Sequence, residues 1–318
     1  MRVVNATPTV RNADDPAAIA EAAELIRAGR LVAFPTETVY GLGANALDPA
    51  AVARVFEAKG RPATNPLIVH VANVEAAREL AADWPPVADR LAERFWPGPL
   101  TLVVEKNARV PDIVTANGPT VGVRVPAHRA ALALLKAAGV PIAAPSANRS
   151  EEVSPTTAQH VVDSLGDRVD LILDGGPSNV GIESTVLDVT QTPPRLLRPG
   201  MVSETMLRAV VSELAADNKG STAGASRSPG QHARHYAPRK PLLVFEEPVY
   251  IAAPGDAFLQ LPRDADAAGA MLYAELRRLD ADPNVHRILA VLWEKEGPKW
   301  TAIHDRLRRA AVPKDDAS

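Results

Sequence analysis

Short apolar segments that stop at a proline constrain the fold of this sequence more than any other feature. Segments 31–34 and 141–144 have this form and are followed by Pro35 and Pro145. Between such segments lie Ala- and Leu-rich stretches of helical length, such as 16–28, that begin near Asp-Pro pairs and end at glycine. Because proline ends a strand and glycine ends a helix, this alternation predicts an α/β fold. Several strands follow one another directly, so we expect a twisted mixed sheet with packed helices rather than a purely parallel sheet.

Hydrophobic spacing and turn residues place the individual elements. We expect helices at 17–28, 49–59, 74–82, 86–95, 129–138, 156–165 and 203–215. We expect strands at 31–34, 66–71, 100–104, 120–125, 141–144, 169–173, 184–189 and 195–197.

A change in composition near residue 213 divides the chain. Residues 1–212 carry the alternating pattern, whereas 213–241 are rich in Gly, Ser, Ala and Pro without hydrophobic periodicity and are interpreted as a linker or lid. Residues 242–318 predict a small α/β domain with strands at 242–245 and 287–292 and helices at 265–279 and 302–311. A unit this small has little core of its own, so we expect it to pack on the first domain.

The composition excludes several classes of protein. The chain has no cysteine, which rules out a disulfide scaffold, a thiolate nucleophile and a sulfur-ligated zinc site. Its 35 Lys and Arg against 38 Asp and Glu give a net charge of −3, which disfavours non-specific DNA binding. The first residues lack a signal-peptide pattern, and no segment approaches the ~20 apolar residues of a membrane span. We therefore expect a cytoplasmic protein with no membrane contact.

Polar side chains lie at or just beyond the ends of several apolar strands. They are the segment 36–38 (Thr-Glu-Thr), His70, Arg124, Ser146, Asn148, Ser184 and Arg198. Ligands of α/β sheets gather at strand ends, so we expect these groups to converge on one cleft. Arg124 is the most telling, because an arginine in an apolar strand needs an anionic partner and no acidic residue lies beside it in sequence.

Each of these residues also has an ordinary structural interpretation. Lys59 lies in the last turn of a helix, where a cation complements the helix dipole. Ser154 before Pro155 is a good helix N-cap, although a helix N-terminus also suits phosphate. His70 is more often a buried structural histidine than a catalyst.

Three apparent motifs are weak. Residues 41–46 imitate a dinucleotide-binding G-x-G-x-x-A, but they do not follow the strand directly and lack the later acidic residue. His232 and His235 lack a third metal ligand, and a Ser146/His70/Asp174 triad lacks a nucleophile elbow.

Longer blocks of sequence resemble a known family. The blocks are FPTETVYGLGANA, KGRPATNPLIVHV, WPGPLTLVV, VGVRVPAH, PIAAPSANRSEEVSPTTAQHV, GIESTVLDV and LLRPG. In this order, over about residues 15–205, they resemble the YrdC-like threonylcarbamoyl-AMP synthases. The block SPGQHARHYAP and the tail are similar to the longer two-domain members, whose C-terminal domain is Rossmann-like and here looks shortened.

The resemblance implies a reaction and a set of substrates. L-threonine, bicarbonate and ATP would give L-threonylcarbamoyladenylate and pyrophosphate in a positively charged cleft. A separate transfer complex would then pass the threonylcarbamoyl group to adenosine 37 of tRNAs that read ANN codons. Mg²⁺ would enter with ATP and be held mainly by the phosphates, with no metal-binding residues in the protein.

The resemblance also implies the site residues. The catalytic residues would be Lys59, Arg61, Ser146 and Asn148. The L-threonine site would comprise Thr38, His70, Arg124, the backbone at Ala144, and Ser184. The ATP site would comprise Arg61, Asn65, Thr120, Ser146, Ser154, Arg198 and Tyr236.

Two other functions remain open from the sequence. The first is a non-catalytic double-stranded RNA-binding or ribosome-maturation module with weak RNA binding. The 4% aromatic content and the residues of the implied L-threonine site count against it. The second is a carbamoyl-handling domain of the hydrogenase-maturation type, whose accompanying acylphosphatase and zinc-finger units this chain does not contain.

Overall fold

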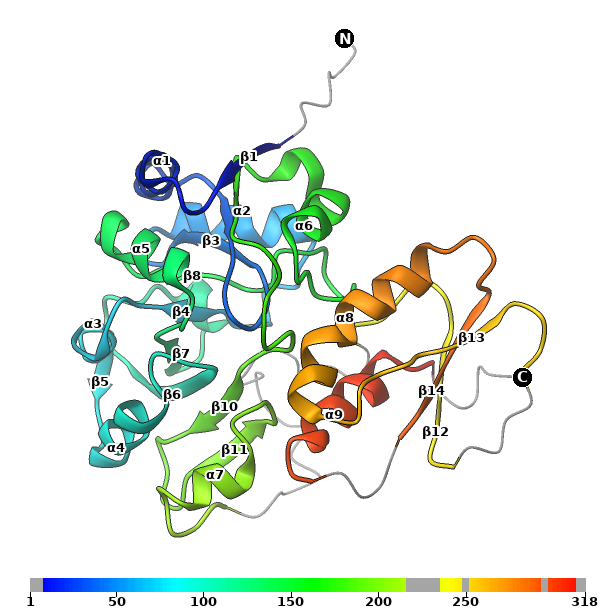
Figure 1. The fold of residues 1–318 in the computed structure, drawn as a ribbon. Coiled ribbons are helices and arrows are strands. Elements are labelled where there is room, and N and C mark those ends of the chain that lie inside the picture. Colours follow the sequence, from blue (N-terminus) through cyan, green and yellow to red (C-terminus); the bar gives the residue numbers. More distant parts are fainter. Residues whose placement is uncertain (1–7, 216–234, 248–251, 293–296, 313–318) are drawn as a thin grey trace.

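The computed structural model describes residues 8–215, 235–247, 252–292 and 297–312. These residues form a larger N-terminal unit and a smaller C-terminal unit (Figure 1).

A mixed sheet is the centre of the N-terminal unit. Its strands are β1 (Thr9–Asn12), β2 (Val32–Phe34), β3 (Gly41–Asn45), β4 (Ile68–His70), β5 (Ala81–Asp83), β6 (Leu100–Lys106), β7 (Thr120–Arg124), β8 (Ile142–Ala143), β9 (Leu171–Asp174), β10 (Thr185–Asp188) and β11 (Arg195–Arg198). In the described part of the chain they form one 11-stranded sheet of order β1-β9-β2-β3-β8-β4-β7-β6-β10-β11, with β5 paired to β6. Strand β4 is parallel to β7 but antiparallel to β8. The prediction of a mixed α/β sheet is confirmed.

The helices of this unit follow the predicted start and stop signals. They are α1 (Pro16–Arg27), α2 (Pro49–Lys59), α3 (Val74–Arg78), α4 (Pro86–Phe95), α5 (Arg129–Ala138), α6 (Ala158–Leu165) and α7 (Glu204–Arg208), with short 3₁₀ turns at Asp112–Thr115 and Gly166–Arg168. The Asp48 side chain caps α2 by accepting from the Ala50 N–H at 2.9 Å. Gly60 ends α2 in the left-handed region, with φ 61°, where glycine is least strained.

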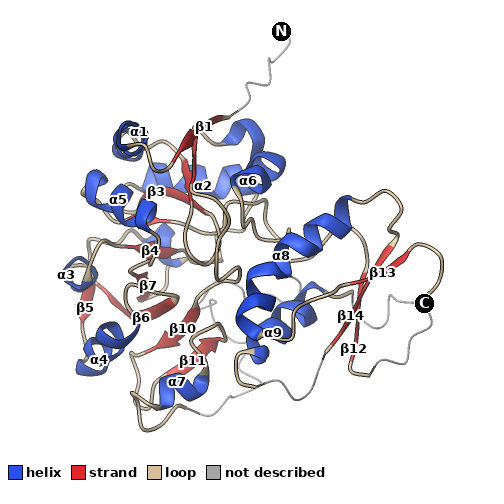
Figure 2. Ribbon diagram, in the orientation of Figure 1, coloured by secondary structure: helices blue, strands red, loops and turns tan. Residues whose placement is uncertain are grey.

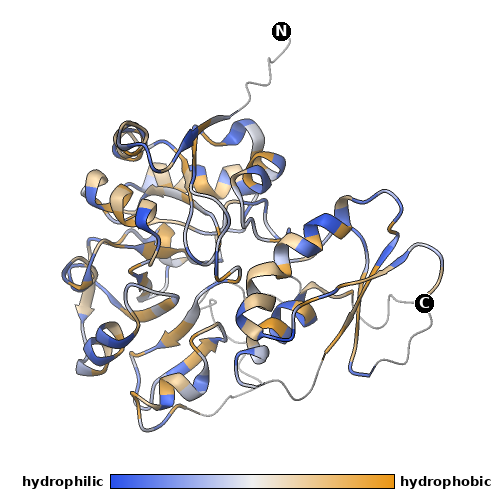
Figure 3. Ribbon diagram, in the orientation of Figure 1, coloured by the Kyte–Doolittle hydropathy of each residue, from blue (hydrophilic) through white to orange (hydrophobic). Residues whose placement is uncertain are grey.

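Both faces of the sheet are buried, as the alternation along β2 shows. Val32 and Phe34 pack in one hydrophobic cluster with residues of α1 and α5, whereas Ala33 packs in another with residues of α2, α4 and α6. The helices beside the sheet (Figure 2) carry both hydrophobic and polar residues (Figure 3). A sheet covered on both faces leaves the strand ends as the place for polar groups.

The C-terminal unit is a small parallel α/β unit. Strands β12 (Leu242–Phe245), β13 (Asp256–Phe258) and β14 (Arg287–Val291) pair in the order β12-β14-β13. Helices α8 (Ala265–Ala281) and α9 (Trp300–Ala310) lie between this sheet and the N-terminal unit (Figure 1). Its hydrophobic cluster includes Ile182 and Met201 of the N-terminal unit, so the two units share a core as expected.

Some elements differ from the predictions. The helix predicted at 74–82 ends at Arg78, because Ala81–Asp83 pairs with β6 as β5. The helix predicted at 203–215 is only α7, and strands β1, β3, β5 and β13 were not predicted. The predicted tail after residue 312 and most of the predicted linker, 216–234, lie outside the described residues.

The weak dinucleotide pattern at 41–46 is largely strand β3, and packing explains its glycines. A Cβ on Gly43 would lie 2.8 Å from both Ile142 Cγ2 and Phe34 Cε1. The glycine therefore permits close approach of neighbouring strands.

Within the described part of the chain, none of the helices is long and apolar enough to cross a membrane.

Candidate active site

One cavity gathers side chains from segments far apart in the sequence. Nine of the predicted site residues line it: Thr38, Arg61, His70, Arg124, Ala144, Ser146, Ser184, Arg198 and Tyr236. Strand register explains part of this convergence, because His70 of β4 pairs with Arg124 of β7 on one side and Ile142 of β8 on the other. Three guanidinium groups thus meet in a cavity at the ends of the central strands.

Arg124 is held by partners on every nitrogen. Nε donates to the Gly98 carbonyl at 3.1 Å, Nη1 donates to Thr38 Oγ1 at 2.9 Å, and Nη2 lies 2.7 Å from Glu37 Oε1. Both members of the Arg124–Glu37 ion pair are buried. The sequence argument that Arg124 needs an anionic partner holds, and Glu37, which is not adjacent in sequence, supplies that partner from a distant loop. Arg124 enters the cavity as half of an ion pair, with a fixed orientation.

His70 is a neutral histidine in this environment. Burial, followed by the positive charge of Arg124, lowers the pKa of His70 to about 3. Its ring meets Phe34 edge-on, with ring centroids 6.1 Å apart. Its Nδ1 is buried and has no hydrogen-bond partner among the described residues. A buried, unpartnered ring nitrogen in a cavity is available to a bound molecule.

Ser184 and Arg198 form a second polar pair. Arg198 Nε donates to the Ser184 carbonyl at 3.0 Å, and its Nη2 donates to Ser184 Oγ at 3.2 Å. Ser184 Oγ also lies 2.8 Å from Thr101 Oγ1 of β6. These contacts fix both side chains on the wall of the cavity.

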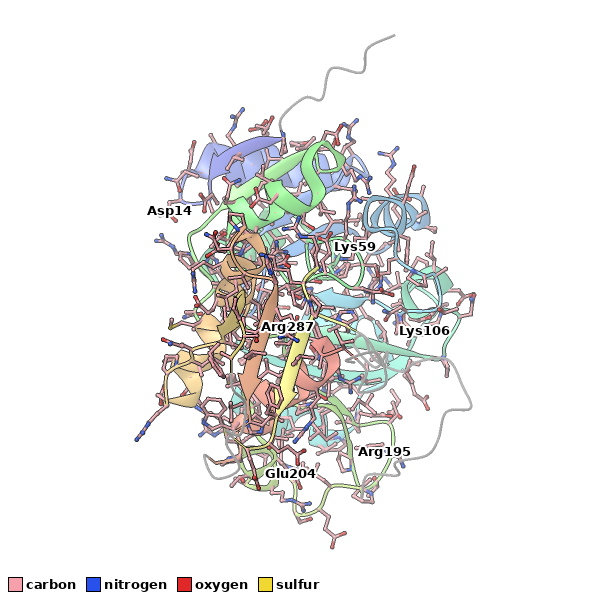
Figure 4. All side chains as sticks on the ribbon, turned by 90° about the vertical axis from the view of Figure 1, so that its right-hand side faces the viewer. Asp14, Lys59, Lys106, Arg195, Glu204 and Arg287 are labelled. Atoms are coloured by element: carbon pink, nitrogen blue, oxygen red, sulfur yellow. The ribbon has the colours of Figure 1, made fainter. Side chains whose placement is uncertain are left out.

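Lys59 and Asn148 lie behind the cavity wall rather than on it. The Lys59 ammonium donates to the Ser146 carbonyl at 2.6 Å and to the Asn148 carbonyl. The Asn148 amide donates to the carbonyls of Arg149 and Glu152 at 2.8 and 2.9 Å. Burial, followed by the charge of Arg61, lowers the pKa of Lys59. Lys59 thus fixes the loop that presents Ser146, and Figure 4 shows it inside the outline of the molecule.

Arg61 is fixed by backbone oxygens. Its Nε donates to the Asn65 carbonyl at 3.2 Å and its Nη2 to the Pro66 carbonyl at 2.9 Å. Burial lowers the pKa of Arg61 to about 10, so it still carries its charge at neutral pH. Asn65 therefore supports Arg61 through its backbone and does not itself line the cavity.

Two further predicted residues are not on the cavity wall. Thr120 begins β7 at the end opposite Arg124. Ser154 is buried, and its hydroxyl donates to Glu183 Oε1 at 2.6 Å. Glu183 does line the cavity, so Ser154 reaches it through this carboxylate.

Tyr236 comes from the described end of the linker. It has a positive φ of 63°, an uncommon conformation for a tyrosine. Its hydroxyl is buried without a hydrogen-bond partner among the described residues. The backbone on either side of Tyr236 is held by hydrogen bonds. His235 N–H donates to the Arg309 carbonyl at 3.0 Å, and Ala237 N–H donates to the Glu151 carbonyl at 2.8 Å.

The sequence interpretation left four residues of this region without a role. Thr36, Glu183 and His235 line the cavity, and Glu37 pairs with Arg124. Each of the four lies beside a predicted site residue in the sequence: Thr36 and Glu37 precede Thr38, Glu183 precedes Ser184, and His235 precedes Tyr236. The position of 36–38 after an apolar strand had already placed Thr36 and Glu37 in the expected cleft, whereas nothing local in the sequence distinguishes Glu183 and His235 from exposed loop residues.

Among the described residues, no three His, Cys, Asp or Glu side chains are grouped so as to hold a metal ion. His232 of the weak histidine pair lies outside those residues.

The structure is an α/β fold of two units, with a cavity that three arginine side chains help to line. A family described as "Telomere recombination", which groups Sua5, YciO and YrdC, matches residues 24–200. A second family, described as "Threonylcarbamoyl-AMP synthase, C-terminal domain", matches residues 202–312. The chain belongs to the Sua5/YciO/YrdC family and carries this C-terminal domain.

Individual proteins agree with this assignment. Threonylcarbamoyl-AMP synthases of Pyrococcus abyssi and Bacillus subtilis are 51% and 48% identical over 229 and 230 residues. The matches cover 71% and 72% of this chain and 67% and 66% of those proteins. The structure of P. abyssi Sua5 complexed with L-threonine is similar with a TM-score of 0.85 and 41% identity, covering 96% of this chain and 97% of that one. This coverage does not support the expectation of a shortened C-terminal domain.

Proposed function

We propose that this protein is an L-threonylcarbamoyladenylate synthase, which converts L-threonine, bicarbonate and ATP into L-threonylcarbamoyladenylate and pyrophosphate. The observation that carries the proposal is the single cavity in which predicted threonine-binding and ATP-binding residues meet. The matches to threonylcarbamoyl-AMP synthases over both units support it.

On the threonine side, the Arg124 guanidinium pairs with the amino-acid carboxylate. Neutral His70 offers its unpartnered Nδ1 to a polar group of the substrate. Thr38 Oγ1 and Ser184 Oγ are each already oriented by an arginine, at 2.9 and 3.2 Å. With the backbone at Ala144, these groups make a small polar pocket suited to a hydroxylated amino acid.

On the nucleotide side, Arg61 and Arg198 bind phosphate oxygens. An arginine fork suits phosphate because it donates two parallel hydrogen bonds. Ser146 and the Tyr236 hydroxyl donate further hydrogen bonds, while Ser154 and Asn65 act through Glu183 and Arg61. Thr120 stays a prediction from the resemblance, because it does not line the cavity.

The chemistry needs orientation and positive charge rather than a covalent intermediate. The threonine amine combines with bicarbonate to form a carbamate and water. A carbamate oxygen then attacks the α-phosphorus of ATP, and pyrophosphate leaves. Arg61 stabilises the negative charge that spreads over the phosphate oxygens, and Lys59 and Asn148 hold the loop that presents Ser146.

Mg²⁺ would enter with ATP and would be held mainly by the phosphates. The Glu183 carboxylate on the cavity wall is not available to a metal, because both of its oxygens accept hydrogen bonds from protein groups.

We place the catalytic domain at 1–212, the linker at 213–241 and the C-terminal domain at 242–318. The product then passes to the complex that transfers threonylcarbamoyl groups to tRNA.

The direct test is an assay with ATP, Mg²⁺, bicarbonate and radiolabelled L-threonine. We expect pyrophosphate release that requires both threonine and bicarbonate, together with a labelled, labile adenylate. Reactions without bicarbonate or with L-alanine are the controls. RNA binding that weakens steeply with salt, without threonine-dependent pyrophosphate release, would instead favour the RNA-binding module.

A further inference from the structure

Glu183 joins the cavity to the C-terminal unit. Its Oε1 accepts a hydrogen bond from Ser154 Oγ at 2.6 Å. Its Oε2 accepts from the Tyr273 hydroxyl and from Arg306 Nε, each at 2.9 Å. Tyr273 belongs to α8 and Arg306 to α9, whereas Ser154 belongs to the N-terminal unit. One carboxylate is therefore shared by both units.

Arg306 is a buried residue with a defined set of partners. Its side chain is only 1% exposed. Besides Glu183, it donates from Nη1 to the Pro199 carbonyl at 2.9 Å and to Asp305 Oδ2 at 3.0 Å. Its guanidinium also lies over the ring of Tyr236, 5.4 Å from the ring centroid. A side chain from α9 thus contacts the linker residue that lines the cavity.

The charge of this pair matters for a phosphate site. A buried carboxylate repels a nearby triphosphate strongly unless a cation neutralises it. Burial alone would raise the pKa of Glu183, but the charges of Arg306 and Arg198 lower it to about 2, so the group is a carboxylate at neutral pH. Arg198 itself lines the cavity, whereas Arg306 does not.

We infer that Arg306 and Glu183 are positioning residues for the nucleotide: Arg306 cancels the carboxylate charge at the cavity wall, and the pair orients Ser154 and Tyr236. The C-terminal unit thereby completes the electrostatics of the site without touching the substrate. This inference rests on the function proposed above.

The test is Arg306→Gln, which removes the charge and keeps hydrogen-bonding capacity. We expect the KM for ATP to rise about tenfold while the KM for threonine changes less than about twofold, because the repulsion acts on the phosphates. The KM for ATP of the variant should also fall as the pH is lowered from 8 to 5.5, because Glu183 now takes up a proton. The parent enzyme should show no such pH dependence.

Two further variants separate charge from packing. Arg306→Lys keeps the charge and should hold the KM for ATP within about threefold of the parent. Adding Glu183→Gln to Arg306→Gln removes the unpaired carboxylate and should restore most of the lost ATP affinity. This double variant also carries the test if the single variant fails to fold, because it removes the buried carboxylate that the single variant leaves without Arg306, and Asp305 keeps its ion pair with Arg309.

Arg287→Gln is the matched control. It breaks the 2.7 Å ion pair between Arg287 of β14 and Asp256 of β13, and neither residue lines the cavity. These strands lie beyond α8 and α9 from the N-terminal unit (Figure 1). It should leave both KM values unchanged. Equal increases in both KM values in Arg306→Gln, or a double variant no better than the single one, would overturn the inference.

Calorimetric titration with ATP alone distinguishes the two proposals. If the parent protein makes no adenylate but binds ATP more tightly than Arg306→Gln, the proposed function fails and the positioning pair stands. If adenylate forms but the parent and Arg306→Gln bind ATP equally tightly, the proposed function stands and the positioning role of Arg306 and Glu183 fails.

Discussion

Glu37 Oε1 lies 2.7 Å from Arg124 Nη2, and both side chains are almost completely buried. The two residues come from the loop after β2 and from the end of β7. Because Thr38 and Gly98 bind the other nitrogens, the guanidinium is fixed before any substrate arrives. The threonine carboxylate therefore meets a preorganised ion pair, which lowers the cost of ordering on binding.

This arrangement predicts two separable effects of Arg124→Ala. The variant should lose threonine binding in calorimetry, and it should also lose about 3–5 kcal/mol of unfolding free energy, because Glu37 is left as an unpaired buried charge. Adding Glu37→Gln should restore stability in urea denaturation but not threonine binding. Recovery of threonine binding in the double variant would contradict the assignment of Arg124 to the carboxylate.

Lys59→Ala and Arg61→Ala should each lower kcat by about a hundredfold or more. Lys59 holds the loop that presents Ser146, and Arg61 stabilises charge on the phosphates. The measurement is threonine-dependent pyrophosphate release, with circular dichroism to show that the variants are folded. Lys136→Ala is the matched control, because Lys136 also lies in the last turn of a helix that ends at glycine but is exposed. Near-normal turnover in both site variants would refute these roles.

Loss of the hydroxyl should affect ATP binding at Tyr236 but protein stability at Tyr273, the two tyrosines at the junction of the units. Tyr236→Phe removes a buried hydroxyl with no partner among the described residues, so stability should not fall, but the KM for ATP should rise about threefold to tenfold. Tyr273→Phe removes a hydrogen bond to Glu183 and should cost about 2 kcal/mol of unfolding free energy. Thermal denaturation and steady-state kinetics check both. A stabilising role for the Tyr236 hydroxyl would appear as a lowered Tm.

The fold should be sensitive to acid. Burial lowers the pKa of His70 and of His235 to about 3, from an ordinary value of 6.5. Below pH 6.5 the unfolded chain therefore binds more protons than the folded one, and each histidine costs roughly 1 kcal/mol of unfolding free energy per pH unit toward pH 3. The Tm should fall between pH 7 and pH 5, and less steeply in His70→Gln. A Tm that is constant or rises over this range would contradict the buried neutral state.

The sequence predicted best what depends on local signals. Helix α5 and strand β12 have the predicted bounds, because turn residues and hydrophobic spacing mark them. Strand β5 was missed because only its pairing with β6 makes it a strand, and β3 because its glycines disguise a buried strand. Local propensity does not contain such pairing information.

The site residues likewise fall into those that local sequence motifs indicated and those that only long-range contacts reveal. Motif resemblance pointed to residues such as Arg61 and Ser146 that do line the cavity. The ion pairs of Arg124 with Glu37 and of Arg306 with Glu183 join distant segments, so no local pattern indicated them. For the same reason the sequence did not show that Lys59 binds loop carbonyls behind the cavity wall.

The Glu183–Arg306 contact also has an evolutionary consequence. A form of the protein that ended after α7 would retain Glu183 and Arg198 but lack Arg306, which forms an ion pair with the carboxylate. We expect such a form to carry an uncharged residue at position 183 or a second cation beside it. The two positions should therefore change together among relatives, even though most of the C-terminal half of the chain separates them.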